Sequence, residues 1–254
     1  MNKKFVKDFI VVENERLNSF NSLLKLRPAD GVMPNVSPGQ FVQVYVEGSK
    51  NTFLRRPISI NNVENGQLWL LVKKVGDGTH AIVNTPVKGI LNIILPLGKG
   101  FSLNPGKILL IGGGVGIAPL LMLGKCLKEY NSEVTFLLGA RTKEELIELE
   151  EFAKYGHVCL STEDGSLGEK GFVTQHSVLK DDFDMIQCCG PLPMMKAVAK
   201  IAMARGLNCE VSLENMMACG LGACLCCVED TKAGNVCVCQ DGPVFNINDL
   251  KWQI

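Results

Sequence analysis

The C-terminal segment of the chain is rich in cysteine. Six of the 11 cysteines lie close together, at residues 219, 224, 226, 227, 237 and 239. A segment of about forty residues is too short to enclose a large hydrophobic core, so a cross-link or a metal has to stabilise it. The segment therefore favours a metal centre.

The spacing of these cysteines favours iron over zinc. Cys219, Cys224 and Cys227 form the pattern C-x4-C-x2-C, which is typical of plant-type [2Fe–2S] clusters when a further cysteine follows. The glycine-rich loop between the first two cysteines allows the backbone to direct N–H groups at the sulfurs. Taken alone, the spacing leaves the fourth ligand open between Cys237 and Cys239. A zinc site built on Cys224, Cys227, Cys237 and Cys239 is the alternative.

The N-terminal residues indicate in which cellular compartment the cysteines function. Lys3 and Lys4 begin like a secretory signal, but the apolar run that follows covers only residues 9–12 before Glu13. A signal needs roughly 7–15 apolar residues. We therefore expect a cytoplasmic protein, in which cysteines bind metals or carry out redox chemistry rather than form disulfides.

Composition and charge narrow the function classes. The 26 basic residues balance the 26 acidic residues, which argues against a nucleic-acid binder. The uncharged run 108–124 is shorter than the roughly 20 residues of a membrane span, and glycines interrupt it, so we expect no membrane insertion. A hydrophobic fraction of 46% in 254 residues indicates a globular protein of more than one domain.

The hydrophobic pattern changes near residue 105. Before it, the apolar runs 41–46, 68–72 and 90–95 are separated by turn residues, which predicts short strands in an antiparallel β-barrel. After it, strands at 108–111, 134–138 and 185–189 alternate with helices that begin near Pro119 and cover 142–155 and 192–205. That alternation predicts a parallel α/β domain. We expect three parts, with boundaries at 1–101, 102–210 and 211–254.

Two glycine-containing turns end strands of the predicted parallel sheet. Residues 112–116 read Gly-Gly-Gly-Val-Gly and lead into a helix, where backbone amides can bind a phosphate. Residues 189–194 read Cys-Gly-Pro-Leu-Pro-Met and leave the same edge of the sheet, where open α/β sheets bind ligands. The next strand ends in Arg141 rather than in an acid for a ribose. The sequence therefore leaves NAD and NADP open, because Arg141 and Lys143 either meet a 2′-phosphate or are solvated.

The strand-like segment 55–60 places two arginines beside a serine. Exposed arginines are usually solvated. Residues 75–80, however, are predicted to turn into a short helix, and the amides of Gly78 and Thr79 can bind a pyrophosphate beside Arg56.

Together these motifs resemble the ferredoxin–NADP reductase superfamily over nearly the whole chain. Its patterns R-P-x-S, G-x-G-x-x-P and C-G-P-x-P-M correspond to residues 56–59, 114–119 and 189–194. Within the superfamily, residues 54–60, 217–224 and 239–245 look like the electron-transfer subunits of type B dihydroorotate dehydrogenases.

The resemblance implies particular binding residues. FAD is bound by two strands and a helix start, at Arg56, Pro57, Ile58, Ser59, Leu71, Val72, Lys73, Gly78 and Thr79. NAD is bound by the two turns, at Gly112, Gly113, Gly114, Val115, Gly116, Cys189, Gly190 and Pro191. The [2Fe–2S] ligands are Cys219, Cys224, Cys227 and Cys239, since the last ligand of the family precedes x-x-G-P-V-F. Cys226 and Cys237 are extra.

The resemblance also implies a function. A partner subunit containing FMN oxidises dihydroorotate to orotate, and electrons pass through the cluster and FAD of this chain to NAD⁺ in pyrimidine biosynthesis. The implied assembly is a heterotetramer of two plus two subunits, and no catalytic base is expected in this chain.

Two alternatives stay open at this point. One is a flavin subunit of another complex, such as a sulfide dehydrogenase or a bifurcating transhydrogenase. The other is a regulatory protein that holds zinc in a degenerate reductase fold.

Overall fold

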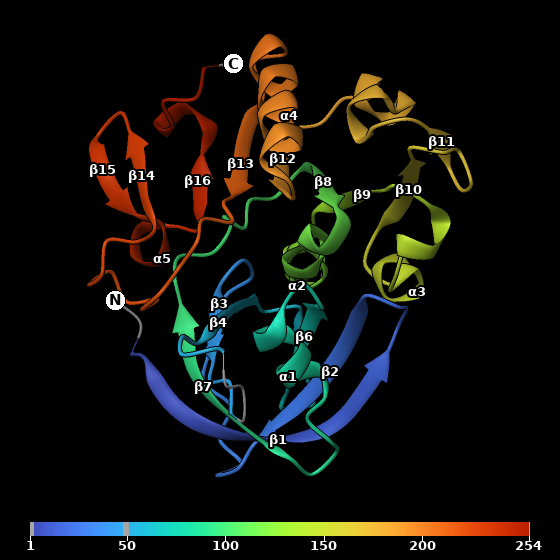
Figure 1. The fold of residues 1–254 in the computed structure, drawn as a ribbon. Coiled ribbons are helices and arrows are strands. Elements are labelled where there is room, and N and C mark those ends of the chain that lie inside the picture. The colour runs from blue at the N-terminus through green and yellow to red at the C-terminus, as the bar shows by residue number, and fades with distance from the viewer. Residues whose placement is uncertain (1–2, 48–50, 254) are drawn as a thin grey trace.

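A computed structural model describes residues 3–47 and 51–253, and its N-terminal part is a curved antiparallel sheet (Figure 1). The strand order is β4-β3-β7-β1-β2-β6-β5. The strands are β1 (Phe5–Arg16), β2 (Asn21–Pro28), β3 (Phe41–Val44), β4 (Arg56–Ser59), β5 (Asn62–Glu64), β6 (Gln67–Lys73) and β7 (Ile90–Leu97). The antiparallel architecture is confirmed. The sequence predicted short strands only, whereas β1 is 12 residues long because it pairs with both β2 and β7.

The inside of this sheet is a hydrophobic core. Phe9 and Leu24 on neighbouring strands are fully buried, as is Ile82 of the short helix α1 (Asp77–Val83). The helix follows the turn at residues 75–76, as the sequence predicted. Burial of each such side chain stabilises the fold by roughly 1.5–3 kcal/mol.

The second sheet is parallel except at one edge. Its order is β11-β10-β9-β8-β12-β13-β16, and β16 runs antiparallel to β13. The strands are β8 (Lys107–Gly113), β9 (Glu133–Ala140), β10 (His157–Thr162), β11 (Glu169–Lys170), β12 (Met185–Cys189), β13 (Asn208–Ser212) and β16 (Val244–Asn246). The parallel α/β prediction is confirmed.

Helices cover both faces of this sheet. They are α2 (Ala118–Glu129), α3 (Leu149–Ala153) and α4 (Leu192–Ala204), with Pro119 in the first turn of α2 as predicted. Alternate residues of β8 pack on opposite faces, Leu109 toward the α4 side and Leu110 toward the α2 side, as expected for a parallel sheet. No helix in the described part of the chain has the length and hydrophobicity to cross a membrane.

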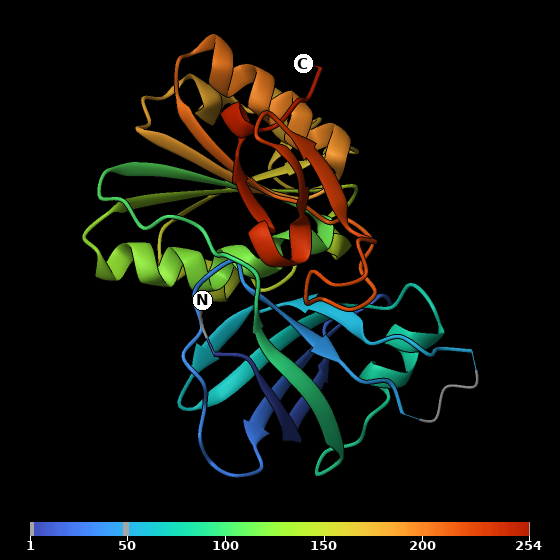
Figure 2. The same ribbon diagram turned by 90° about the vertical axis from the view of Figure 1, so that its left-hand side faces the viewer.

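The cysteine-rich segment packs where the two sheets meet (Figure 2). It contains the hairpin β14 (Val228–Thr231) and β15 (Gly234–Cys237), then the short helix α5 (Val238–Asp241). Cys227 and Cys239 are buried in the hydrophobic core on one face of the parallel sheet. The segment therefore shares a core with the α/β part, and β16 ties it to the sheet edge.

The single helix predicted for residues 142–155 is wrong. The chain forms a 3₁₀ turn at Lys143–Glu145 and then α3, with an extended residue and a left-handed residue between them. The left-handed residue is Glu148, with φ of 58°. The break buries Ile147 and turns Glu148 toward Asn61 of the first sheet, whose Nδ2 donates to Glu148 Oε2 at 3.1 Å. Tertiary contacts have overridden the local helical pattern.

Glu148 is a buried acid at the junction of the two sheets. Burial raises its pKa to about 7, and the hydrogen bond from Asn61 opposes this only in part. Its Oε1 atom has no hydrogen-bond partner among the described residues. The ionised carboxylate is therefore poorly solvated here.

We expect the protein to lose stability as the pH rises through this range. Because the folded state binds the Glu148 proton more tightly than the unfolded state, the free energy of unfolding falls between about pH 4.5 and pH 7, by on the order of 3 kcal/mol. Glu148→Gln keeps the acceptor for Asn61 without the charge. It should raise the melting temperature at pH 8 and flatten the pH profile. Thermal unfolding from about pH 5 to 8 measures both effects.

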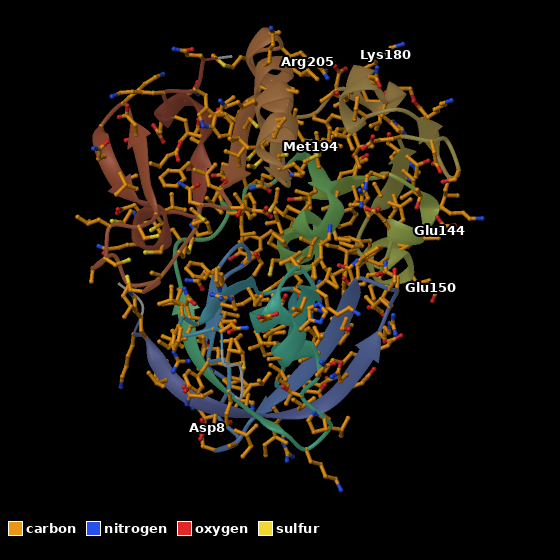
Figure 3. The ribbon with its side chains drawn as sticks, viewed as in Figure 1. Asp8, Glu144, Glu150, Lys180, Met194 and Arg205 are labelled. Atoms are coloured by element: carbon orange, nitrogen blue, oxygen red, sulfur yellow. The ribbon has the colours of Figure 1, made fainter. Side chains whose placement is uncertain are left out.

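The neighbouring Glu150→Gln provides the control. Glu150 is an exposed acid in the first turn of α3, two residues after Glu148 (Figure 3), so its removal should leave the pH profile unchanged. An identical pH profile for the wild type and Glu148→Gln would contradict the role of this carboxyl.

Candidate functional site

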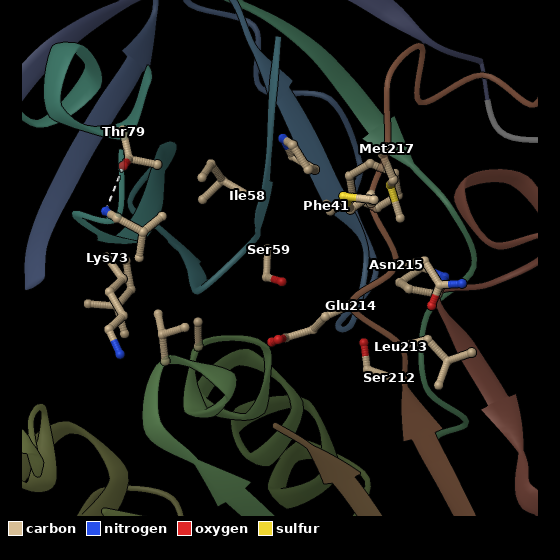
Figure 4. Close-up of a pocket in the computed structure, with 17 residues that line it drawn as sticks. Phe41, Ile58, Ser59, Lys73, Thr79, Ser212, Leu213, Glu214, Asn215 and Met217 are labelled. Atoms are coloured by element: carbon tan, nitrogen blue, oxygen red, sulfur yellow. Dashed lines mark hydrogen bonds between the residues drawn. The ribbon is translucent and has the colours of Figure 1, made fainter. Parts of the chain in front are cut away.

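A cavity of about 350 Å³ lies between the two sheets (Figure 4). The first sheet, the turn after β8 and the segment after β13 all contribute to it. We call it the first cavity. Its lining residues are Phe41, Pro57, Ile58, Ser59, Leu71, Lys73, Val75, Thr79, Val115, Ala118, Ser212, Leu213, Glu214, Asn215, Met216, Met217 and Pro243.

Six of the residues predicted to bind FAD line this cavity, namely Pro57, Ile58, Ser59, Leu71, Lys73 and Thr79. The other three do not. Val72 lies one step along β6 from Leu71, and strand alternation directs its side chain into the core of the first sheet. Arg56 and Gly78 lie against each other, since a Cβ on Gly78 would stand 2.5 Å from Arg56 Nε.

The two neighbouring arginines have different surroundings. Arg55 donates to Asn92 Oδ1 at 2.6 Å and to the Asn92 carbonyl at 2.9 Å, and it stacks over the ring of Tyr45. Burial lowers its pKa. The Arg56 side chain makes only one hydrogen bond within the described residues, a long one of 3.4 Å to the Arg55 carbonyl. Arg55 is therefore a structural residue, and Arg56 is the cation available to a phosphate.

Thr79 caps the start of α1. Its hydroxyl accepts from the backbone N–H groups of Val75 and Gly76, at 2.9 and 3.2 Å, and donates to the Gly76 carbonyl. The hydroxyl thus holds the turn beside Arg56 in place.

Sequence reasoning missed the segment 212–217, which forms one wall of the first cavity. Figure 4 shows Glu214 projecting into the cavity near Ser59 and Ser212. The protein atoms around the Glu214 carboxyl keep water from it and so raise its pKa, while the positive charge of Lys73 acts to lower it. The one signal for this segment in the sequence is its position directly after the carboxyl end of a parallel strand, where ligands bind.

A second cavity of about 550 Å³ lies at the carboxyl edge of the parallel sheet. Lys73 lines both cavities, so the two meet there. The lining residues of the second cavity are Lys73, Gly113, Gly114, Gly139, Ala140, Arg141, Glu145, Glu163, Gly171, Phe172, Val173, Thr174, Pro191, Pro193, Met194 and Ala197. Apart from Gly113, Gly114 and Pro191, these were not predicted to bind NAD. Met194 stands at the start of α4 (Figure 3).

Other residues predicted to bind NAD pack the two turns together. A Cβ on Gly116 would lie 2.6 Å from the Cys189 carbonyl oxygen, and one on Gly190 would lie 3.1 Å from the Gly113 nitrogen. Gly112 also lies outside both cavities, and a Cβ there would collide with the side chains of Ile117 and Leu120. By contrast, Gly114 has φ of 57° and no atom near its Cβ position, so its backbone is open to the cavity.

Val115 lines the first cavity, and Cys189 lines neither. The Cys189 side chain is 1% exposed. Burial raises the pKa of its thiol, and the neighbouring Ser212 opposes this shift only in part. Cys189 is therefore a buried thiol behind the wall of the first cavity.

Three of the four predicted cluster ligands accept hydrogen bonds from backbone amides. Leu221 N–H donates to Cys219 Sγ at 3.3 Å, Gly222 N–H to Cys239 Sγ at 3.1 Å, and Cys239 N–H to Cys227 Sγ at 3.3 Å. Burial acts to raise the pKa of Cys219, but amide hydrogen bonds outweigh it and lower that pKa to about 6. Such donors stabilise thiolates and the negative charge of an iron–sulfur cluster.

The thiols also affect one another's pKa in two pairs. Cys224 acts to lower the pKa of Cys219, whereas burial together with the thiol of Cys227 raises the pKa of Cys239 to about 12. Each iron of a [2Fe–2S] cluster takes two thiolates, whereas zinc gathers four ligands around one point. Four thiolates are the ligand set of a [2Fe–2S] cluster, so the chemistry of these donors fits such a cluster.

A buried glutamine gives a second test of this fit. The side chain of Gln43 on β3 is fully buried, and neither of its polar atoms has a partner among the described residues. It packs against Gly220, where a Cβ would lie 2.7 Å from Gln43 Cγ. An unpaired buried amide costs about 1–3 kcal/mol, so its presence beside the cysteine loop is consistent with a bound polar group there.

Comparison with known proteins identifies the family. A family model of the iron–sulfur cluster binding domain of dihydroorotate dehydrogenase B matches residues 214–251, and one of an oxidoreductase NAD-binding domain matches residues 110–200. The dihydroorotate dehydrogenase B (NAD⁺) electron transfer subunit of Caldanaerobacter subterraneus subsp. tengcongensis is 42% identical over 82% of this chain and 84% of that protein. The chain belongs to this family of electron-transfer subunits. The corresponding protein of Fusobacterium nucleatum is 35% identical, over 97% of this chain and 98% of its own length.

Solved structures confirm the reductase fold of this dihydroorotate dehydrogenase B family member. A chain of an electron-bifurcating NADH-dependent reduced ferredoxin–NADP oxidoreductase matches with a TM-score of 0.86 and 30% identity, over 96% of this chain and 90% of that one. The FAD/NAD-binding domain of a nitric oxide dioxygenase from Vibrio cholerae matches with a TM-score of 0.69 and 23% identity, over 81% of this chain and 98% of that one. The predicted family, fold, iron–sulfur domain and NAD-binding domain are confirmed.

Proposed function

We propose that this chain carries electrons from a dihydroorotate-oxidising partner subunit to NAD⁺ in pyrimidine biosynthesis. Its redox groups are a [2Fe–2S] cluster and FAD. When bound, the cluster carries single electrons, and FAD exchanges them for the two-electron chemistry of the nicotinamide.

The observation that carries this proposal is the order of the three sites. Met216 and Met217 line the first cavity and directly precede the cysteine loop at Cys219. Lys73 lines both cavities. The cysteine loop, the first cavity and the second cavity are therefore contiguous, which is the arrangement that a relay from cluster to flavin to nicotinamide requires.

Particular residues serve each group in this proposal. The cluster is held by Cys219, Cys224, Cys227 and Cys239. FAD is held by the sequence-predicted residues, with Arg56 beside its phosphates and the lining of the first cavity around its ring. NAD is held by the second cavity, where Gly113, Gly114 and Pro191 are the sequence-predicted residues in its lining. Ser59 and Glu214 face the first cavity together and can hold a proton there.

The partner belongs to the same proposal. It is an FMN-containing catalytic subunit that oxidises dihydroorotate, so this chain needs no substrate base. We propose a cytoplasmic heterotetramer of two plus two subunits. We also propose that residues 1–101 form the FAD-binding part, 102–210 the NAD-binding part and 211–254 the cluster-binding part.

Anaerobic visible spectroscopy tests the relay. The purified chain should show flavin and iron–sulfur absorbance that bleaches when NADH is added. With the partner present, dihydroorotate should reduce NAD⁺, and without the partner it should not. A colourless chain that holds zinc would contradict the relay. Failure of a competent partner to support turnover would contradict the assigned substrate.

A second function is favoured by one observation. The bifurcating oxidoreductase chain resembles this one at 30% identity, over 96% of this chain and 90% of that one. The second function is that of a flavin subunit in such a bifurcating complex, where the chain would accept electrons from a different flavin subunit. The same turnover assay separates the two, because only the first function gives NADH formation that depends on dihydroorotate.

A further inference from the structure

The far end of the second cavity lies where β9 and β10 finish. Lys73 marks the end that meets the first cavity. Gly139 and Ala140 end β9, Arg141 follows it, and all three line only the second cavity. In open α/β sheets of this kind, the residue that follows the second strand meets the ribose hydroxyl of NAD or the 2′-phosphate of NADP. In this chain that residue is Arg141. An arginine there can meet a 2′-phosphate or be solvated, so the sequence considered alone leaves NAD and NADP open.

Arg141 is already engaged by a carboxylate. Its Nε donates to Glu145 Oε1 at 2.9 Å, and its Nη2 lies 2.7 Å from the same oxygen. The two residues are four apart, across a single 3₁₀ turn, so the pair forms without any ligand. The side chain of Glu145 is 18% exposed against 64% for Arg141, so the carboxylate is the better-fixed partner.

A second carboxylate lies on the neighbouring strand. Glu163 directly follows β10 and lines the same cavity, and it forms no ion pair within the described residues. Lys143 lies on the same turn as Glu145, yet it does not line the cavity. The charges of Arg141 and Glu145 cancel each other, so the carboxylate of Glu163 gives this end of the cavity a net negative charge.

We infer that Glu145 and Glu163 make the second cavity selective for a dinucleotide with a free 2′-hydroxyl. A carboxylate accepts a hydrogen bond from that hydroxyl, whereas a 2′-phosphate brings about two further negative charges. Glu145 acts as a positioning residue, because it holds the Arg141 guanidinium that otherwise binds the phosphate. This inference rests on the proposed role of the cavity as the NAD site.

Binding of nucleotide fragments tests the inference without electron transfer. The probes are ADP-ribose and 2′-phospho-ADP-ribose, titrated calorimetrically into the full chain with its redox groups in place. The wild type should favour ADP-ribose. Glu145→Gln frees Arg141 and should strengthen binding of the 2′-phosphate form by about tenfold or more, with little change for ADP-ribose. Glu163→Gln should shift the ratio in the same direction.

Two further variants identify the cause. Adding Arg141→Gln to Glu145→Gln should abolish the gain, because the freed cation is its source. Glu151→Gln is the matched control, since it removes an acid from another ion pair of the same domain, that with Lys154, outside the cavity. Its binding ratio should equal that of the wild type.

The outcomes separate this inference from the proposed function. Equal fragment ratios in the wild type and Glu145→Gln would overturn the selectivity role while leaving the NAD site intact. A wild-type preference for the 2′-phosphate form would also overturn it. A folded chain that binds neither fragment would overturn the NAD site itself, and the selectivity with it.

Discussion

Cys239→Ser is expected to abolish the iron–sulfur absorbance of the purified chain, whereas Cys237→Ser should retain it. The sulfur of Cys239 is buried, accepts the Gly222 N–H and contacts Cys227. The sulfur of Cys237 approaches the Gly222 carbonyl instead, at 3.8 Å. Loss of one thiolate from a four-thiolate cluster removes a metal ligand outright, so we expect loss of nearly all bound iron.

Iron content per chain and visible absorbance measure this effect. Cys226→Ser is the matched control, because Cys226 is exposed and its sulfur lies near the Met216 carbonyl at 3.6 Å. It should bind iron as the wild type does. If Cys239→Ser kept the cluster and Cys237→Ser lost it, the fourth ligand would be Cys237.

Arg56→Ala is expected to release FAD during purification. Arg56 lies against the start of α1 at Gly78 and has no strong partner within the described part of the chain. A charge-assisted hydrogen bond to a phosphate contributes on the order of 1.5–3 kcal/mol, so affinity should fall roughly ten- to hundredfold. The flavin-to-protein absorbance ratio and FAD titration of the stripped chain measure the change.

Arg27→Ala is the control for this substitution. Arg27 is an exposed arginine on β2 of the same sheet and does not line the first cavity. It should retain FAD and fold as the wild type does. Equal FAD affinity of Arg56→Ala and Arg27→Ala would remove Arg56 from the FAD site.

Much of the fold could be predicted from local pattern. The strand at Met185–Cys189, the helix with Pro119 in its first turn and the short helix after residue 76 all lie where the sequence placed them. Each depends on periodicity and turn residues within one segment. The failure at residues 142–155 has the opposite cause. There, burial of Ile147 and the contact between Glu148 and Asn61 join distant segments, and no local pattern encodes that contact.

In the candidate site, too, local pattern predicted some features and tertiary contacts decided the others. The order of the cysteines and of the two glycine turns pointed to the chemistry, because ligand spacing and tight turns are properties of one continuous segment. The sequence pointed to Arg56, but it could not show what holds Arg55. The partners of Arg55, Tyr45 and Asn92, come from other segments.

The sequence by itself determined the family, the fold class and the kinds of redox group that the chain is built to hold. Only the tertiary structure decided which side chains are free to meet them. It paired Arg141 with Glu145, placed Glu163 beside them and brought Glu214 to the first cavity. The physical reason is that the charge available to a ligand depends on every neighbour a side chain has, and those neighbours are set by the path of the whole chain.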